Sequence, residues 1–151
     1  MTASILHPVR ATFRAVAVTV VPETASLSPD AWLELEGVVM GATGSRPVAL
    51  QRQLVSFIRL IEWLPVARFG SRFSRLGAER RVHVLSKLQN APLLLIRRGF
   101  WGLRTLVYMG YYTRPDIQAG LGYRADARGW SARRTTGEAR NATQPEQNHA
   151  P

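Results

Sequence analysis

The sequence has no cysteine, only one lysine (Lys87), and half as many acidic as basic residues. Without cysteine the chain forms no disulfide, no thiolate zinc site and no iron–sulfur cluster. With 20 basic and 10 acidic residues among 151, the formal net charge is +10, and it is carried almost wholly by arginine. Arginine binds carboxylate and phosphate groups through a planar fork, so an anionic partner is one hypothesis. Codon bias in a GC-rich genome is the plain alternative.

The chain also lacks a long uninterrupted apolar run. Arg10 and Arg14 interrupt the apolar stretch near the N-terminus, and no arginine pair precedes it, so no export signal is predicted. Residues 92–112 are long enough to span a bilayer but contain three arginines, each of which costs about 2.5–3.5 kcal/mol near the middle of a span. We therefore expect no transmembrane span and a cytoplasmic location, with peripheral contact to a membrane left open.

What is present favours an all-α protein. Hydrophobic residues make up 46% of the chain and charged residues 20%, which is enough for one domain with a core. Proline and glycine divide the chain into five segments with helical spacing of apolar residues. We predict a compact bundle of about five helices over residues 1–130 and a disordered tail over 131–151. The predicted helices lie near residues 8–22, 28–44, 47–65, 77–90 and 92–112.

The local signals are caps and turns. Ser28 and Asn90 are predicted N-caps, each followed by a proline suited to the first helical turn. Residues 70–76 are predicted as a polar connection, 114–116 as a turn and 120–123 as a tight loop. Apolar residues at helical spacing are expected to face the core, and the last helix, apolar on nearly every side, is expected in the middle of the bundle. The residues expected to face inward include Leu50, Leu64, Val82, Leu85 and Leu88.

Chemistry-bearing motifs are scarce. His7, His83 and His149 have no metal-binding spacing, and no serine stands in a nucleophile elbow. Gly120 and Gly122 lack the third glycine of a dinucleotide fingerprint. The sequence therefore predicts no catalytic, cofactor-binding or metal-binding residue in this chain, and no enzymatic activity of its own.

Three arginines within the last helix are the first candidates for a binding site. Arg97 and Arg104 are seven residues apart and so lie on one side of a helix, about 10 Å from each other, with Arg98 and Trp101 between them. An arginine in an apolar helix needs an anionic partner. That partner is either a carboxylate of this chain or a carboxylate or lipid phosphate outside it. The internal candidates are Glu34, Glu36, Glu62 and Glu79.

Aromatic residues near the end of this helix are the second group of candidates. Tyr111, Tyr112, Tyr123 and Trp130 are of the residue types enriched, with arginine, at protein interfaces. The basic charge is spread along the chain, with no lysine-rich run and no recognition module, so we expect no nucleic acid as partner. A basic peripheral protein that binds membranes or nucleic acid is the alternative function.

Several short sequence motifs resemble those of the family typified by gluconate 2-dehydrogenase subunit 3, whose members accompany flavin-containing glucose-methanol-choline-type oxidoreductases. They are Leu64-Pro65, Arg72 to Leu76, Glu79 to Pro92, Met109 to Pro115, and Leu121 to Tyr123. The resemblance implies a helical, non-catalytic subunit that binds a large oxidoreductase subunit, with the FAD held by that partner. It also implies docking roles for Arg97, Arg104, Tyr111, Tyr112, Tyr123 and Trp130. The twin-arginine signal usual in the periplasmic members is missing from this sequence.

Overall fold

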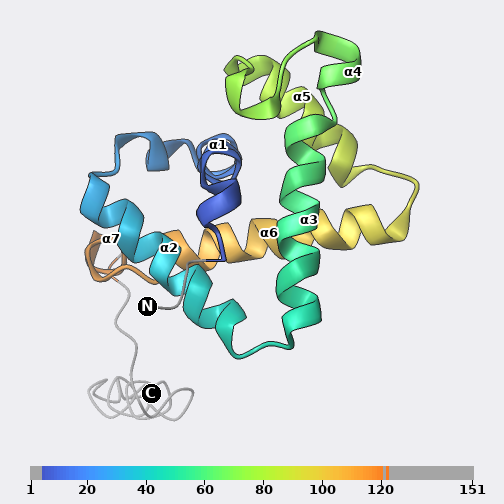
Figure 1. The fold of residues 1–151 in the computed structure, drawn as a ribbon. Helices are drawn as coiled ribbons and strands as arrows, with labels where there is room; N and C mark the ends of the chain where they lie inside the picture. Colours follow the sequence, from blue (N-terminus) through green and yellow to red (C-terminus); the bar gives the residue numbers. More distant parts are fainter. Residues whose placement is uncertain (1–4, 121, 123–151) are drawn as a thin grey trace, which may run out of the picture. The chain divides into compact units, whose positions relative to one another are not determined.

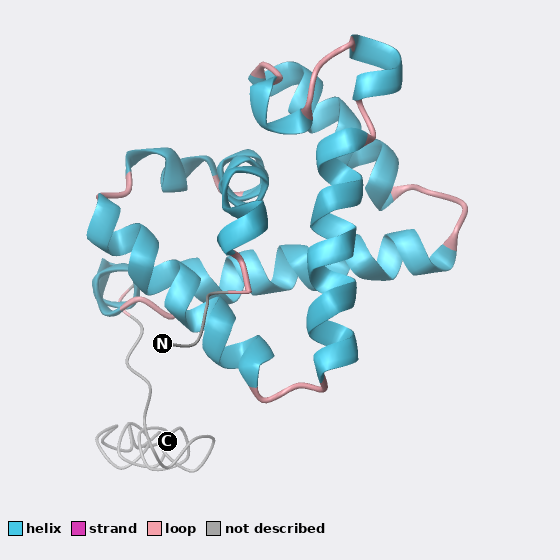
Figure 2. Ribbon diagram, in the orientation of Figure 1, coloured by secondary structure: helices cyan, strands magenta, loops and turns pink. Residues whose placement is uncertain are grey.

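The computed structural model describes residues 5–120 and 122, and every regular element in these residues is a helix (Figure 1). The all-α prediction is confirmed. Figure 2 shows the helices joined by short connections. The five long helices occupy the five predicted segments: α1 (Arg10–Val20), α2 (Pro29–Gly44), α3 (Val48–Trp63), α5 (Ala78–Gln89) and α6 (Leu94–Tyr112). Shorter helices lie between or beside them: η1 (His7–Val9), η2 (Pro22–Ser26), α4 (Val66–Phe69), η3 (Phe73–Arg75) and α7 (Pro115–Gly120).

The chain divides after Ile117 into two units. The first unit holds all of the long helices and is the one described below. Of the second unit, residues 118–120 and 122 are described, and the first three of these belong to α7. The predicted domain boundary at residue 130 and the predicted tail at 131–151 lie outside the described residues.

The start of α2 follows the sequence signal. The Ser28 hydroxyl accepts a hydrogen bond from the Ala31 N–H at 3.2 Å, and Pro29 occupies the first helical position. Asp30 in the same turn lies at the positive end of the helix dipole. A capping residue, a proline that needs no hydrogen bond and an acid thus begin this helix together.

Two local predictions are wrong. The Asn90 side chain does not cap α6 but donates to the Ser86 carbonyl oxygen at 2.9 Å, at the end of α5. The predicted turn at 114–116 is instead the start of α7, because Pro115 fits a first helical turn and Asp116 follows it. Arg114 there is buried and donates to the Asp116 carboxylate at 2.7 Å.

The core of the first unit is built around one side of α6, which packs against α1, α2, α3 and α5. From α6, Phe100, Leu103, Val107 and Tyr111 are buried at spacings of three and four residues. They join one cluster with buried side chains of the other elements, each of which contributes about 1.5–3 kcal/mol through burial. These include Phe13, Val16, Leu35, Val39, Ile58, Ile61, Phe73 and Leu85.

Two glycines allow α6 to approach its neighbours. A Cβ atom on Gly110 would lie 2.9 Å from the Leu35 Cγ atom and 3.0 Å from the Leu35 carbonyl oxygen in α2. A Cβ atom on Gly99 would lie 2.9 Å from the Phe57 ring in α3. At Gly99 a side chain would displace the Phe57 ring, whereas at Gly110 it would meet backbone and push α6 away from α2. The crossing of α6 with α2 therefore depends on Gly110.

Some residues predicted to face inward are exposed. In α3, Ile58 and Ile61 are buried, whereas Leu50 and Leu64 at its two ends are exposed. Figure 1 shows α3 extending past α6 in both directions. The two buried isoleucines lie in the C-terminal half of α3, a helix that packs against α1 and η3 as well as α6, and its two ends are left uncovered. Val82 of α5 is exposed for a similar reason, because this helix buries only the narrow stripe of Val84, Leu85 and Leu88.

The predicted polar connection at 70–76 has an apolar anchor. Phe73 within it is fully buried, and its carbonyl oxygen accepts a hydrogen bond from the Arg81 side chain at 3.3 Å. The same guanidinium group donates to the Ser74 carbonyl oxygen at 2.7 Å. This segment is therefore fixed against α5 rather than being a solvated linker.

Candidate functional site

The side of α6 that faces away from the core is exposed and largely apolar. Its members recur at helical spacing over 19 residues, a length of about 28 Å. Leu95 is 83% exposed and Trp101 51% exposed. The expectation that α6 lies in the middle of the bundle is thus wrong for this side. We call this surface the outer face of α6: Leu94, Leu95, Arg97, Arg98, Trp101, Thr105, Met109 and Tyr112.

Two of the predicted arginines stand on this face without a counter-ion from the described part of the chain. Arg97 and Arg98 are exposed, and no carboxylate in residues 5–120 and 122 lies within 4.0 Å of either guanidinium group. The sequence of α6 contains no acidic residue. The outer face is therefore positively charged as well as apolar.

Arg104 lies at the border between the outer face and the core. Its guanidinium carbon stands 5.2 Å from the centre of the Trp101 ring and 5.1 Å from that of Tyr108. Its Nε–H donates to the Tyr108 hydroxyl at 2.9 Å. Cation–π contacts of this kind contribute about 0.5–1 kcal/mol at exposed sites. The three side chains form a stacked group that holds the half-exposed Trp101 ring in place.

Three of the four acids proposed as internal partners of these arginines are engaged elsewhere, and the fourth, Glu79, lies more than 4.0 Å from every described arginine. The buried carboxylate of Glu36 pairs with Arg10 at 3.0 Å and with Arg14 at 2.7 Å. Glu34 lies 3.7 Å from Arg114, and Glu62 accepts hydrogen bonds from hydroxyl and backbone donors. Internal pairing, one of the two alternatives for the α6 arginines, is therefore not found among the described residues.

The two predicted tyrosines of α6 have different surroundings. Tyr112 is exposed, whereas Tyr111 is buried and packs edge to face against it, with the ring centres 5.1 Å apart. Burial raises the pKa of Tyr111 above its ordinary value of 10.0, and the carboxylate of Glu23 adds to the rise. Tyr111 thus contributes to the core, and Tyr112 is the tyrosine that the outer face presents.

Two further predicted docking residues, Tyr123 and Trp130, lie outside the described residues. The outer face of α6 therefore includes four of the eight candidate residues, Arg97, Arg98, Trp101 and Tyr112, and Arg104 lies at its border.

Sequence reasoning missed the feature that makes the N-terminal part of α6 distinctive. Leu93, Leu94 and Leu95 are consecutive and all more than half exposed. The signal was in the sequence, because three leucines in a row span too wide an arc to face one core. From the sequence alone the leucine run predicts a central helix, because an apolar sequence does not reveal whether another element covers it.

A hollow of about 180 Å³ adjoins this surface. It lies between α1, α5 and α6 and is lined by Thr19, Gln89, Arg104 and Tyr108 among others. It is too small for an organic cofactor, since ligand pockets measure about 300–1,000 Å³. It gives the outer face a recess beside the stacked group of Arg104.

The described residues contain neither a candidate metal site nor a helix that could span a membrane. Residues 5–120 and 122 contain no group of three His, Cys, Asp or Glu side chains placed to hold a metal ion. Within the same residues, no helix combines the length and the apolar character needed to cross a bilayer. The second finding agrees with the prediction that the arginines of α6 prevent it from spanning a membrane.

Comparison with protein-family models, with curated proteins and with solved structures gave no match to this chain. The resemblance to the gluconate 2-dehydrogenase small subunits therefore rests only on the short sequence motifs given above.

Proposed function

We propose that this chain is a non-catalytic accessory subunit that binds and stabilises a larger flavin-dependent alcohol, sugar or sterol-type dehydrogenase or oxidase. The observation that carries the proposal is the outer face of α6, an exposed helical stripe of leucine, tryptophan, methionine, tyrosine and arginine. Aromatic residues, methionine and arginine are the types enriched at protein interfaces, where they supply most of the binding energy.

The chemistry of the outer face specifies the partner surface. The apolar stripe requires a groove lined by apolar side chains, as in other complexes where a helix lies in a groove. Arg97 and Arg98, which have no described counter-ion, require carboxylates at the edge of that groove. The resemblance supplies the class of partner, a large subunit that holds FAD and carries out the chemistry. The small subunit itself needs no cofactor for this role.

Co-expression with a flavin-dependent oxidoreductase encoded next to this chain tests the proposal. We expect the two chains to purify together, with flavin absorbance in the complex. Trp101→Ala and the double charge reversal Arg97→Glu with Arg98→Glu should each abolish co-purification. The matched control, Arg59→Glu with Arg75→Glu, changes the same charge away from α6 and should leave the complex intact. A complex that forms equally well with all of these variants would refute the docking surface.

The exposed leucines favour a second candidate, binding to an anionic membrane surface. Leu93, Leu94 and Leu95 followed within one turn by Arg97 and Arg98 would suit insertion among lipid chains beside lipid phosphates. Flotation with phosphatidylglycerol vesicles separates the two candidates. A charge-dependent membrane protein floats with the vesicles and detaches as salt rises, whereas a subunit held by buried aromatics stays bound to its partner at high salt.

A further inference from the structure

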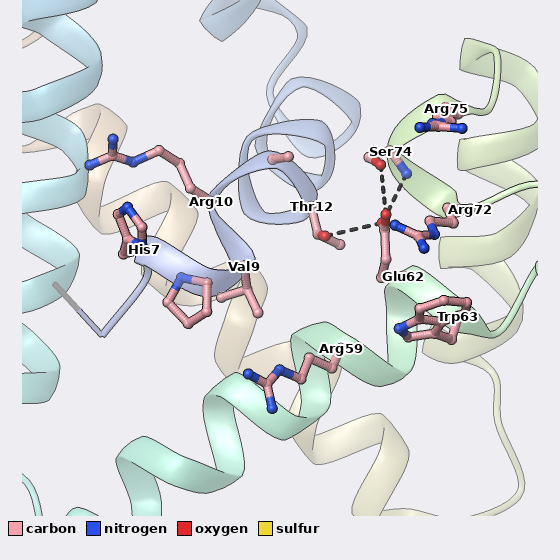
Figure 3. Close-up of a pocket in the computed structure, with 12 residues that line it drawn as sticks. His7, Val9, Arg10, Thr12, Arg59, Glu62, Trp63, Arg72, Ser74 and Arg75 are labelled. Atoms are coloured by element: carbon pink, nitrogen blue, oxygen red, sulfur yellow. Dashed lines mark hydrogen bonds between the residues drawn. The ribbon is translucent and has the colours of Figure 1, made fainter.

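A second concave region lies away from α6, at the meeting point of three segments distant in sequence. It is a cleft of about 490 Å³, formed by residues 7–12, by the C-terminal half of α3 and by the segment around η3 (Figure 3). Its volume lies within the range of small-molecule sites, about 300–1,000 Å³. The walls combine apolar groups with four arginines: Arg10, Arg59, Arg72 and Arg75.

One carboxylate, that of Glu62, lies in the cleft, and three hydrogen bonds from neutral donors engage it. It accepts hydrogen bonds from the Thr12 hydroxyl at 3.0 Å, the Ser74 N–H at 3.0 Å and the Ser74 hydroxyl at 2.7 Å. Figure 3 shows these bonds joining α1, α3 and the η3 segment across the cleft. Glu62 thus holds the walls together, and among the described residues no arginine lies within 4.0 Å of it.

The arginines of the cleft are therefore largely uncompensated. Arg10 pairs with Glu36 at 3.0 Å, outside the cleft. For Arg59, Arg72 and Arg75, no described carboxylate lies within 4.0 Å. Three guanidinium groups around one engaged carboxylate leave an excess of positive charge in a concave region, where an anion is attracted more strongly than at a flat surface.

One of these arginines is oriented by an aromatic ring. The guanidinium carbon of Arg72 stands 4.4 Å from the centre of the Trp63 ring. Stacking occupies the flat face of the guanidinium group and leaves its N–H edge free to donate to an anion, which reduces the entropy lost on binding. The Trp63 side chain is about half exposed, so part of its surface is accessible to a planar group.

We propose that this cleft binds a small organic polyphosphate of about the size of a nucleoside diphosphate. The cations come from α3 and from the η3 segment, so an extended anion with several charged oxygens matches them better than a single phosphate ion. Arginine forks bind phosphate oxygens in pairs. The Trp63 ring and the apolar wall of Pro8 and Val9 accommodate the uncharged part of the ligand. This site is independent of the outer face of α6.

Isothermal titration with inorganic pyrophosphate, ADP and adenosine, at constant ionic strength, tests the proposal on the full chain. We expect saturable binding of pyrophosphate and ADP and no binding of adenosine alone. ADP should bind more tightly than pyrophosphate, and Trp63→Leu should remove that difference. The double variant Arg59→Gln with Arg75→Gln should weaken binding of both by at least about tenfold, because it removes two charge-assisted hydrogen-bond donors from the cleft.

The control is Arg97→Gln with Arg98→Gln, which removes the same charge from the outer face of α6 and should bind both ligands as the unaltered chain does. All of these arginines are exposed, and circular dichroism verifies that the variants fold. The proposal is overturned if neither pyrophosphate nor ADP binds saturably, or if both double variants lose affinity equally, which would mean a general effect of net charge. Neither result bears on the docking of a protein partner to α6.

Discussion

Two arginine–tryptophan pairs in this protein share a geometry but not an environment. Arg14 stands 5.0 Å from the Trp32 ring centre, and Arg104 stands 5.2 Å from that of Trp101. Trp32 is 8% exposed, and Arg14 also pairs with the buried carboxylate of Glu36. Trp101 is half exposed, and no described carboxylate lies within 4.0 Å of Arg104.

This difference distinguishes the arginines that stabilise the fold from those that are exposed on a surface. A guanidinium group that packs against the core requires an anion of the same chain, because an unpaired charge in a low dielectric is costly. The pair between α1 and α2 meets that requirement through Glu36. The pair on α6 stacks only on aromatic rings, and its neighbours Arg97 and Arg98 are solvated. The α1–α2 pair is therefore structural, and the α6 pair is available to a partner.

The largest expected effect contrasts the two tryptophans. Trp32→Ala should lower the free energy of unfolding by about 3–5 kcal/mol, because it leaves a cavity in the core. Trp101→Ala should lower it by only about 1–2 kcal/mol, because half of that side chain is already in water and the rest contributes partial burial and a contact with Arg104. Urea denaturation followed by circular dichroism measures both. Similar losses in the two variants would show that the α6 pair also stabilises the fold.

The second contrast removes charge. Arg10→Gln with Arg14→Gln should cost about 2–3 kcal/mol of unfolding free energy, since Glu36 would remain buried without a cation. The cost is set below that of a fully buried pair because both arginines are about one third exposed. Arg97→Gln with Arg98→Gln removes the same charge and should leave stability nearly unchanged. Equal effects in urea titrations would mean that net charge, rather than pairing, determines stability.

The third contrast compares the inner and outer sides of α6 at two glycines. Gly110→Ala should destabilise the protein by about 1–2 kcal/mol, because the new methyl group meets the Leu35 backbone at 3.0 Å. Gly102→Ala should stabilise it by up to about 1 kcal/mol, because nothing lies within 4 Å and alanine is the better helix former. Thermal unfolding of the two variants gives opposite shifts of the midpoint if α6 has one packed and one free side.

The smallest effect concerns the two tyrosines at the end of α6. Because burial raises the pKa of Tyr111, its contribution to stability is fully present below the ordinary value of 10.0 and is lost as the pH rises through the folded-state value. Tyr111→Phe should therefore reduce the loss of stability above about pH 10. Tyr112→Phe should act in the same direction but less, because the neighbouring Tyr112 adds to the rise of the Tyr111 pKa. Thermal midpoints measured across the alkaline range test this. An unchanged alkaline profile in Tyr111→Phe would show that other groups dominate there.

Helix positions were largely predictable, because they depend on local features that the sequence states directly. The Ser28 cap and the first-turn Pro29 predicted the start of α2, and apolar spacing predicted the five long helices. The errors occurred where two local signals competed. Asn90 can cap the helix that follows or close the one that precedes it, and the structure has the second. The proline of 114–116 fits a turn or a first helical turn, and here it begins α7.

The sequence indicates which residues are of the types found at interfaces, but it does not indicate the environment of each one in the fold. The sequence predicts Arg97, Arg98, Trp101 and Tyr112 as candidate interface residues, and all four lie on an exposed face of α6. It grouped Tyr111 with them, although that ring is buried beside its neighbour. The arginine cleft around Glu62 was missed altogether, because its walls come from segments about 50 residues apart, and no local pattern joins them.

By itself the sequence determined the helical class, the positions of the long helices, the basic charge and the absence of cysteine chemistry. These follow from composition and from interactions between residues a few positions apart. Only the tertiary structure decided which arginines find carboxylates, which side of α6 is covered and where a cleft forms. Those outcomes depend on which distant surfaces meet, and an arginine's neighbours across space determine whether it holds the fold together or faces a partner.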